Sequence, residues 1–508
     1  MLTESHDLHS GVVPWRESAW PAPPSNPFPN GPVDIAILGS GIVGALIAER
    51  LSGKGRRIAL FDRRPPGFGS TAASTAEIMW AMDVPMSELA RTLGEVEAAR
   101  RWRRVHDSVR DLGMRIDGFG IDCGRVDRPT LYLAGTILDE AGLAAEAEMH
   151  RRHDLPSTFL EADEMAQRFG IAPRAAIVSE DGFEIEPVRL CHALLERACR
   201  NGASVTWPVD VTAIHPVDDG ILLETADGRR CQARDVILAT GYERASLFLP
   251  PAFTLHSTFA IATPPGCVPL WREQAMIWEA SDPYLYMRAD RLGRIIAGGE
   301  DHDSSDEDTR DALIGVKAGI IAAKLEAMLG AGPIPIDRAW AAIFGSSPDG
   351  LPAIGPAAAM PHVWLAAGFG GNGVAFANLA AQIFERELNG VPDPDRDCFS
   401  VSLRVTGPCA GPVTASCRSG VRRRLPLQAE RRPTRGRKAH PIVLDGGNEA
   451  AREKVMVVIM RPAVGFGHLD PVTLDLVDGA DMDAIGADDF HMLFDLTEIG
   501  HVKCSFLR

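Results

Sequence analysis

The clearest hydrophobic pattern in the chain spans residues 33–62. Val33 to Leu38 is a short, mostly apolar run, which is typical of a buried parallel strand. Residues 42–51 then repeat apolar side chains at helical spacing, and residues 57–61 form a second strand-like run. The pattern therefore predicts a strand–helix–strand unit near the N-terminus.

Three glycines mark the junction between this strand and helix. Gly39, Gly41 and Gly44 have G-x-G-x-x-G spacing, which suits a tight turn, close approach of backbone N–H groups to a pyrophosphate, and close packing of helix on strand. The helix start offers free N–H groups and a positive dipole end to phosphates. Asp62, 18 residues after Gly44, is placed to accept hydrogen bonds from ribose hydroxyls. The unit predicts dinucleotide binding but does not separate FAD from NAD.

Small and hydroxyl side chains dominate residues 69–75, directly after this unit. Such a loop can approach a flat ring system, and Ser70, Thr71 and Ser74 can hydrogen-bond phosphate or ring heteroatoms; a flexible serine loop is the alternative. Apolar spacing then predicts one long amphipathic helix over residues 86–112. Shorter runs predict a strand at residues 131–133 and helices at 138–153, 162–169 and 187–200.

The middle of the chain predicts a strand that returns to the dinucleotide sheet and then a second sheet. Strands are expected at residues 204–207 and 211–214, the strand at 221–225 is expected to pair with a later one across a turn at 226–228, and the strand at 236–241 is the one that returns. Antiparallel strands are expected at residues 254–262, 284–289, 294–298 and 336–344, with a helix at 306–328. Acids between Glu300 and Asp308 lack fixed metal-ligand spacing, so we interpret them as a charged loop that supplies helix N-terminal acids.

A second glycine-rich junction follows the strand expected at residues 363–367. It spans Gly368 to Gly373 and leads into a helix at residues 374–388. No acid follows it within a second strand–helix–strand unit, so it does not predict a second dinucleotide site. Its helix start would instead present N–H groups to a group that gains negative charge.

Composition narrows the class of protein. The 508 residues carry a formal net charge of −16, which disfavours general nucleic-acid binding. No apolar run reaches the length of a membrane span, and the N-terminus lacks a signal-peptide pattern. The 9 cysteines contain no C-x-x-C pair, which favours free thiols in a reducing compartment and hence a cytoplasmic protein.

Taken in order, these motifs resemble the D-amino-acid oxidase-like FAD-dependent oxidoreductases, which include glycine oxidase and sarcosine oxidase. The resemblance covers about residues 34–404 and rests on Gly39 to Gly44, Asp62, the 69–75 loop, Ala239-Thr240-Gly241, residues 349–356 and Gly368 to Gly373. It implies an α/β fold with a glutathione-reductase-type FAD-binding Rossmann domain and an antiparallel-sheet substrate domain, and an unassigned C-terminal extension follows beyond it. The expected boundaries are a Pro-rich arm at 1–32, an FAD-binding domain at 33–80, 185–245 and 345–400, and a substrate domain at 81–184 and 246–344.

The resemblance also implies which residues hold non-covalent FAD. The expected set contacts the ADP half, the pyrophosphate, the adenine through a backbone pairing, and the pyrimidine side of the flavin. Its members are Gly39, Ser40, Gly41, Ile42, Val43, Gly44, Asp62, Arg63, Ser70, Thr71, Ser74, Val211, Thr240, Gly241, Gly370, Gly371, Asn372 and Gly373.

The sequence departs from the amino-acid oxidases of this family at one telling place. They carry an arginine for the substrate carboxylate just before an Asp-Gly-x-Pro segment, but residues 343–348 contain none. A simple amino-acid substrate is therefore not indicated. Tyr284, Tyr286 and Arg288 are the remaining candidates to face substrate, with ordinary sheet packing and a surface cation as the alternative interpretation.

The chain beyond the resemblance has a different composition. Residues 405–440 are rich in proline and arginine and predict a disordered basic linker, and residues 441–508 predict a small acidic appendage in which 455–460 pairs with 472–477. The first ten residues are expected to be an irregular surface arm or a disordered leader.

These observations favour an oxidoreductase that oxidises a C–N bond of an amine or amino-acid derivative, with dioxygen or another electron acceptor. A flavin dehydrogenase of a hydroxy acid or polyol phosphate is one alternative. A non-catalytic flavin-bearing subunit that recruits a partner through its tail is another. A pyridine-nucleotide disulfide reductase is disfavoured, because the sequence lacks a second complete fingerprint and a redox cysteine pair.

Overall fold

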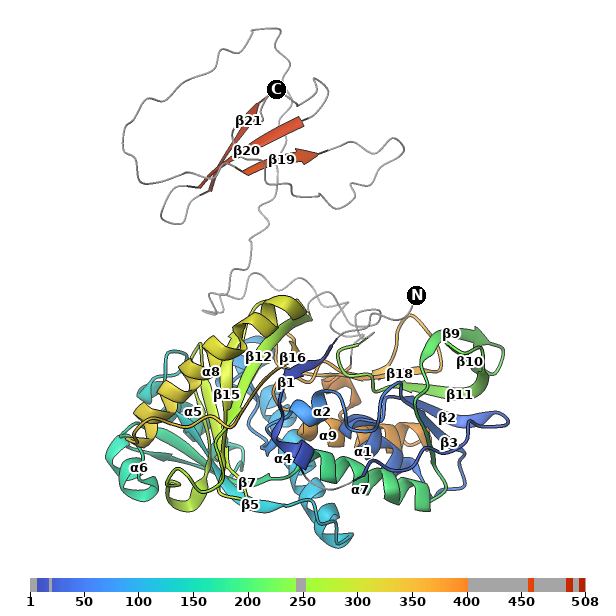
Figure 1. The fold of residues 1–508 in the computed structure, drawn as a ribbon, viewed down its shortest axis with the longest axis horizontal. Coiled ribbons are helices and arrows are strands. Elements are labelled where there is room, and N and C mark those ends of the chain that lie inside the picture. Colours follow the sequence, from blue (N-terminus) through green and yellow to red (C-terminus); the bar gives the residue numbers. More distant parts are fainter. Residues whose placement is uncertain are drawn as a thin grey trace. The chain divides into compact units, whose positions relative to one another are not determined.

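The computed structural model describes residues 7–17, 21–243 and 253–400, together with the backbone of three strands between residues 456 and 507. The chain divides into two compact units, Met1–Val421 and Arg422–Arg508. The first unit contains two sheets, one of eight strands and one of ten (Figure 1).

The eight-stranded sheet carries the strand–helix–strand unit at its centre. Its order is β17-β18-β11-β2-β3-β8, and β9 and β10 extend it from β11. The neighbours from β18 to β8 are parallel, whereas β17 pairs antiparallel with β18. The bounds are β2 (Val33–Leu38), β3 (Ile58–Phe61), β8 (Ser204–Thr206), β9 (Val211–Val217), β10 (Gly220–Thr225), β11 (Arg230–Leu238), β17 (Ala353–Pro356) and β18 (Val363–Ala367).

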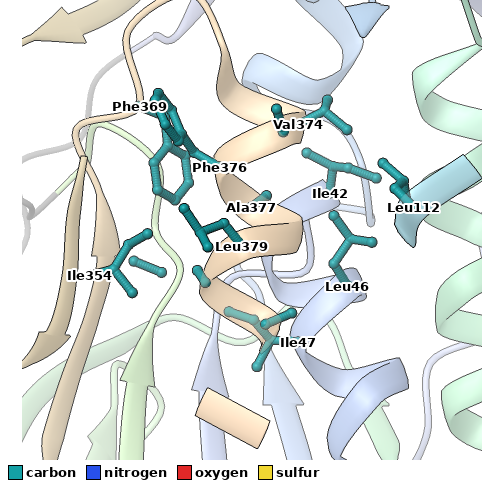
Figure 2. Packing of buried hydrophobic residues seen from close by; sticks show 14 of the residues in the cluster. Ile42, Leu46, Ile47, Leu112, Ile354, Phe369, Val374, Phe376, Ala377 and Leu379 are labelled. Atoms are coloured by element: carbon teal, nitrogen blue, oxygen red, sulfur yellow. The ribbon is translucent and has the colours of Figure 1, made fainter. Parts of the chain in front are cut away.

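Three helices pack together against one face of this sheet. They are α1 (Ile42–Leu51), α7 (Pro187–Arg200) and α9 (Gly373–Leu388), with α1 in contact with the other two. Strand β2 is buried on both faces. Ile35 and Ile37 belong to the core beneath the helices, while Ala36 and Leu38 belong to a second core that also includes residues of the β9–β10 hairpin. Figure 2 shows Ile42 and Leu46 of α1 near Val374 of α9.

The ten-stranded sheet is mostly antiparallel. Its order is β1-β16-β12-β15-β14-β13-β5-β7-β4, and β6 pairs with β7. Helix α8 (Glu307–Leu329) lies against β12, β15 and β16 (Figure 1). The bounds are β1 (His9–Gly11), β4 (Glu77–Ile78), β5 (Val126–Leu133), β6 (Ser157–Leu160), β7 (Ala176–Glu184), β12 (Thr254–Ala262), β13 (Met276–Glu279), β14 (Leu285–Ala289), β15 (Ile295–His302) and β16 (Arg338–Ser346).

Two further helices, α5 (Glu140–Arg152) and α6 (Ala162–Phe169), lie close to their predicted ranges. The acids before α8 were predicted to supply helix N-terminal acids, and Asp306 does so. Its side chain accepts a hydrogen bond from the Thr309 N–H at 2.8 Å and caps the helix. Within the described residues, none of the helices combines the length and apolar character that crossing a membrane requires.

The single long helix predicted for residues 86–112 is wrong. The structure has α3 (Met86–Leu93) and α4 (Glu95–Gly118), separated at Gly94, whose φ is +82°. A positive φ cannot continue a right-handed helix, and glycine adopts it without a steric penalty. The apolar periodicity runs through both helices, which is why it did not reveal the break.

The N-terminal arm is more structured than predicted. Residues His9–Gly11 form β1 on the edge of the ten-stranded sheet, paired with β16. Trp15, which follows, is only 4% exposed and donates a hydrogen bond from Nε1 to the Ser74 carbonyl at 3.0 Å. Residues 1–6 lie outside the described part of the chain.

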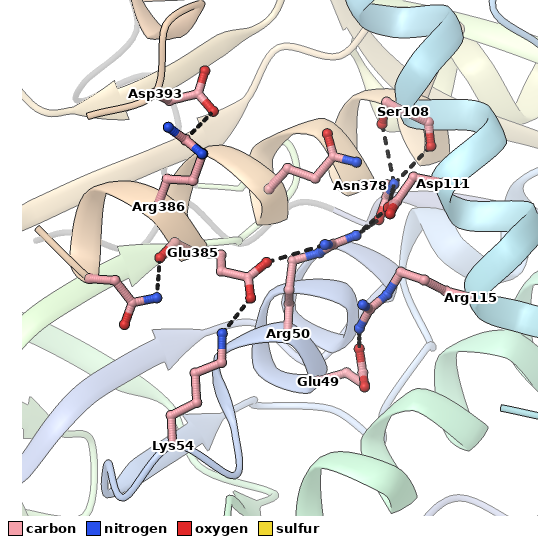
Figure 3. A network of polar contacts seen from close by, with 12 residues as sticks. Glu49, Arg50, Lys54, Ser108, Asp111, Arg115, Asn378, Glu385, Arg386 and Asp393 are labelled. Atoms are coloured by element: carbon pink, nitrogen blue, oxygen red, sulfur yellow. Dashed lines mark hydrogen bonds and ion pairs between the residues drawn. The ribbon is translucent and has the colours of Figure 1, made fainter. Parts of the chain in front are cut away.

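A charged network joins the helices that begin at the two glycine junctions. Arg50 of α1 contacts Asp111 of α4, and it reaches Asn378 and Glu385 of α9 at 3.2 Å each (Figure 3). Lys54 pairs with the same Glu385. Because Arg50 is only 8% exposed, this network ties α1, α4 and α9 together in a partly desolvated setting.

The second unit contributes an antiparallel three-stranded sheet. Its strands are β19 (Met456–Met460), β20 (Phe490–Leu496) and β21 (Val502–Leu507), with β20 in the centre. The strand predicted at 455–460 therefore exists, but it pairs with β20. The predicted partner at 472–477 and the predicted linker at 405–440 lie outside the described residues.

Candidate active site

Both glycine junctions line one cavity of about 910 Å³. Gly39 and Gly41 contribute from the end of β2, and residues 368–373 contribute from the end of β18. The two segments are more than three hundred residues apart in the chain, and the parallel register of β2, β11 and β18 brings their strand ends to the same edge of the sheet. Such an edge is the usual ligand site of an open parallel sheet.

The first junction is built by backbone contacts that only glycine permits. Gly39 has φ +109°, and a Cβ there would overlap the carbonyl oxygen of Ala239. A Cβ on Gly44 would overlap the carbonyl oxygen of Gly39, so α1 packs directly on the turn. These contacts place the start of α1 against the end of β2.

Asp62 is fixed at the end of β3 by three hydrogen bonds. Its Oδ2 accepts from the Ser40 N–H at 2.7 Å and from the Ser40 hydroxyl at 2.9 Å, and its Oδ1 accepts from the Arg64 N–H at 2.9 Å. Asp62 lines the cavity beside Arg63. Both Arg63 and Arg64 pair with Glu243, so the acidic carboxylate of Glu243 already balances them.

The loop predicted at residues 69–75 contains one helical turn, α2 (Ser70–Ala73). The Thr71 hydroxyl accepts a hydrogen bond from the Ile42 N–H at 2.9 Å, which ties this turn to the start of α1. The Ser70 Oγ is buried and has no hydrogen-bond partner among the described residues. A buried hydroxyl without a partner is costly, so Ser70 offers a hydrogen bond to whatever occupies the cavity.

Three consecutive carbonyls of this loop are held by buried side chains. Trp340 Nε1 donates to Ala73 at 2.9 Å, Trp15 Nε1 donates to Ser74, and Arg288 Nε donates to Thr75 at 2.5 Å. The wall of the cavity is thereby fixed from behind by the arm, β14 and β16.

Arg288, predicted as a candidate to face substrate, does not line the cavity. It is 1% exposed, and its remaining nitrogens donate to the carbonyls of Ala289 and Ile185 at 3.1 and 3.0 Å. Tyr286 and Tyr284, two and four residues before it on the same sheet face, do line the cavity. The loop at 74–76 covers Arg288, the third residue of this alternating series, and the alternation of side chains along the strand could not reveal that contact.

The second junction is tied to the segment that follows β4. The Gly370 N–H donates to the Gly345 carbonyl at 2.9 Å, and the Gly371 N–H donates to Asp83 Oδ2 at 2.8 Å. The Asn372 side-chain amide donates to the Ala81 carbonyl at 2.7 Å. Asp83 therefore lies directly at the N-terminal end of α9, where N–H groups favour a negative charge.

The predicted cofactor residues divide into two groups. Ser40 and Gly44 do not line the cavity; they support it from behind, Ser40 through Asp62 and Gly44 through close packing. The others line it: Gly39, Gly41, Ile42, Val43, Asp62, Arg63, Ser70, Thr71, Ser74, Val211, Thr240, Gly241, Gly370, Gly371, Asn372 and Gly373.

Three cavity acids were missed by the sequence analysis. Burial raises the pKa of Glu77 to about 8, against the opposing charge of Arg288. Burial likewise raises the pKa of Asp301 to about 6, and burial raises the pKa of Asp83 against the Gly371 hydrogen bond. The sequence analysis grouped Asp301 with the acids of the loop before α8, but Asp301 lies on β15. The position at which the strand pattern ends was the signal that could have separated Asp301 from the loop acids.

The residues present fit the flavin dinucleotide that the resemblance implies. The unpartnered Ser70 hydroxyl, Gly41, and Gly241, at which an added Cβ would meet no atom within 4 Å, line the same cavity as the start of α1. A Cβ on Gly41 would lie 3.0 Å from Thr71 Oγ1, so a side chain would fill the space between α1 and α2. Backbone amides and hydroxyls are the groups that hold a pyrophosphate at a helix start.

Comparisons with known proteins agree with this geometry. Glycine oxidase from Bacillus licheniformis is 24% identical over 371 residues, covering 71% of this chain and 94% of its own. The crystal structure of glycine oxidase from Geobacillus kaustophilus superposes with a TM-score of 0.59 at 19% identity, covering 73% of this chain and 99% of its own. L-α-glycerophosphate oxidase from Mycoplasma pneumoniae, solved with FAD bound, gives a TM-score of 0.59 at 16% identity and covers 72% and 97%. Residues 34–386 match the family model described as FAD dependent oxidoreductase, and the chain therefore belongs to that family.

Proposed function

We propose that this protein oxidises a C–N bond of an amine or amino-acid derivative with FAD as its cofactor. The observation that carries the proposal is the single cavity, which both glycine junctions and the strands β13, β14 and β15 of the ten-stranded sheet line together. A flavin held at the junctions would face substrate bound against those strands. The relative named glycine oxidase supports an amine-containing substrate by its name.

When bound, FAD would accept a hydride equivalent from the carbon next to nitrogen, and dioxygen or another acceptor would then remove the two electrons. The oxidised substrate is an imine, which water hydrolyses to a carbonyl compound and a free amine. The start of α9, at residues 370–373, would offset negative charge near the flavin. The residues of the first junction with Asp62 would hold the ADP half.

The substrate-side residues would orient the amine and exclude water. Burial raises the pKa of Tyr284 well above its ordinary value, so its hydroxyl remains neutral and offers hydrogen bonds without acting as a base. The reacting amine must be the free base, because its nitrogen lone pair forms the C=N bond. A dry, aromatic wall favours that neutral form.

Anaerobic bleaching of the flavin tests the proposal. Purified protein reconstituted with FAD should be yellow, and a secondary or primary amine should bleach its absorbance near 450 nm faster as the pH rises toward the pKa of the amine, about 10. Lactate and glycerol 3-phosphate serve as matched alcohol substrates. Bleaching by an alcohol and by none of the amines would refute C–N oxidation.

The alcohol chemistry is the second candidate, because one structural neighbour is named L-α-glycerophosphate oxidase. A phosphate or carboxylate substrate requires a cation near the sheet, and the arginines that line the cavity within the described residues, Arg63 and Arg64, are both paired with Glu243. A non-catalytic flavin subunit is the third candidate, favoured by the additional unit at Arg422–Arg508. Deleting residues 405–508 and measuring both turnover and complex size separates a catalytic chain from a recruiting one.

A further inference from the structure

Acidic side chains outnumber basic ones on the substrate side of the cavity. Six acids of the described chain line it from β4, β13 and β15 and the segments next to them: Glu77, Asp83, Glu279, Asp282, Asp301 and Asp303. Some of them lie near a cationic or imidazole group: Glu77 is close enough to Arg288 for that charge to lower its pKa, Glu279 pairs with Arg174 at 2.6 Å, and Asp303 contacts His256 at 3.0 Å. Within the described residues, no lysine lines the cavity.

Asp83 and Asp301 line the same cavity. Burial is the main cause of the raised pKa of Asp301, and the negative charge of Asp83 raises it further. Two carboxylates that share one cavity disfavour each other's charge, and a cation between them would relieve this repulsion.

Some of the acidic oxygens also lack hydrogen-bond donors. Both carboxylate oxygens of Glu77 and the Oδ1 atom of Asp301 are buried and have no hydrogen-bond partner among the described residues, while the Asp301 carboxylate as a whole interacts with the hydroxyls of Thr258 and Tyr284. Among the described residues, the Asp83 carboxylate accepts one hydrogen bond, from the Gly371 N–H to Oδ2. These oxygens are free to accept N–H donors from an occupant, and leaving them unsatisfied is costly.

Aromatic rings complete the wall around these acids. The chain contains 4 tyrosines, and all of them line this one cavity: Tyr132, Tyr242, Tyr284 and Tyr286. Tyr132 stacks on Trp278 with ring centroids 3.8 Å apart, and the rings of Tyr284 and Tyr286 are 5.9 Å apart. Acids combined with tyrosine and tryptophan rings are the chemistry that binds an ammonium group and repels a carboxylate.

The acids cannot serve the reacting nitrogen alone. A carboxylate beside an ammonium raises the ammonium pKa, whereas the nitrogen that is oxidised must lose its proton before the C=N bond can form. A second, non-reacting cation resolves this conflict, since it keeps its charge on the acids while the reacting amine is neutral. We propose that the substrate is a diamine or polyamine that carries no carboxylate, with its non-reacting ammonium held by Asp83 and Asp301 among the tyrosine rings.

This inference rests on the proposed function, and one series of three compounds tests it on the FAD-loaded full chain. N-methyl-1,4-diaminobutane, N-methylbutylamine and 4-(methylamino)butanoate share the same reacting N-methyl group and differ in a distal ammonium, methyl or carboxylate. In anaerobic flavin bleaching, we expect the half-saturating concentration to be at least about tenfold lower for the diamine than for the monoamine, and highest for the acid. Bleaching that is best with the acid or equal for all three would overturn the inference while leaving C–N oxidation intact.

Bleaching by glycerol 3-phosphate or lactate, with none of the three amines active, would instead remove the proposed function and this inference with it. Asp83→Asn and Asp301→Asn should each reduce the preference for the diamine over the monoamine by about tenfold. The preference is a ratio of two half-saturating concentrations within one variant, so a general loss of flavin binding or turnover would not produce this result. Asp218→Asn, at an exposed turn outside the cavity, is the matched control and should change neither value. A preference that survives both cavity substitutions would contradict the assignment.

Binding without turnover gives an independent measurement. 1,4-Bis(trimethylammonio)butane carries two permanent charges, and calorimetry should detect its binding to the holoenzyme, with at least about tenfold weaker binding in Asp83→Asn or Asp301→Asn. Glycine betaine, which pairs the same cation with a carboxylate, should bind more weakly. If either Asn variant does not fold, the wild-type comparison decides, and equal affinity for the two compounds would overturn the inference.

Discussion

The contact between α1 and the turn that precedes it offers the sharpest test of the first glycine junction. In Gly44→Ala the added methyl group would overlap the Gly39 carbonyl oxygen and lie 3.1 Å from its carbonyl carbon. Both atoms are backbone, so no side chain can rotate away, and α1 must move off the turn. Overpacking of this kind costs about 1–3 kcal/mol, partly offset by the roughly 0.5–1 kcal/mol that alanine gains over glycine within a helix.

Gly315→Ala on α8 is the matched control. Gly315 also lies inside a helix, but its new methyl group would meet no atom within 4 Å, so we expect a gain of about 0.5–1 kcal/mol. The two alanine variants should therefore differ by about 1–3 kcal/mol in the free energy of unfolding measured in urea.

The same displacement should weaken FAD binding in the Gly44 variant alone. Titration of the apoprotein with FAD, followed by quenching of flavin fluorescence, measures this directly. The reasoning is refuted if Gly44→Ala unfolds at the urea concentration of the control and binds FAD equally well.

Three further predictions concern stability. Burial raises the pKa of Asp111, but the charge of Arg50 and the amide hydrogen bonds together lower it by more, so the net pKa lies below the ordinary value. Arg50→Ala should therefore cost about 2–4 kcal/mol of folding stability at pH 7. This cost should shrink as the pH falls below about 4 and Asp111 becomes protonated. A cost that is the same at pH 3 and pH 7 would argue against this pairing. Burial raises the pKa of Glu77 to about 8, so the protonated form that the folded protein favours is lost as the pH rises through that value. Urea unfolding measured from pH 5 to pH 9 should show the wild type losing stability relative to Glu77→Gln. Stability curves that stay parallel over this range would contradict the prediction. Gly94→Ala should destabilise the chain by about 1–2 kcal/mol, since alanine is strained at φ +82°; a neutral result would mean that α3 and α4 can join into one helix.

Much of the fold could be predicted because its signals are local. The G-x-G-x-x-G spacing, the apolar strand before it and the helical periodicity after it all lie within thirty residues, and the structure places β2, α1 and β3 there. Glycine also marked the second junction, where Gly368 and Gly370 have φ of +69° and +56°, a conformation that other residues rarely adopt. The family model over residues 34–386 agrees with the resemblance that these motifs carry.

The remaining features depend on contacts between distant segments. Nothing near Arg288 indicates that the loop at 74–76 and the arm at Trp15 would cover it. Asp83 follows β4 in sequence but meets Gly371 only through the fold, 288 residues later. The pairing of β1 with β16 is likewise a long-range contact, and a three-residue strand carries too little pattern to be predicted alone.

The account rests on both glycine junctions holding one and the same flavin nucleotide. A crystal structure of the FAD-loaded protein tests this most directly. We predict pyrophosphate density against Gly39 to Gly44 and the pyrimidine edge of the flavin against Gly370 to Gly373, with one FAD per chain. A flavin that contacts one junction and lies away from the other would contradict the account.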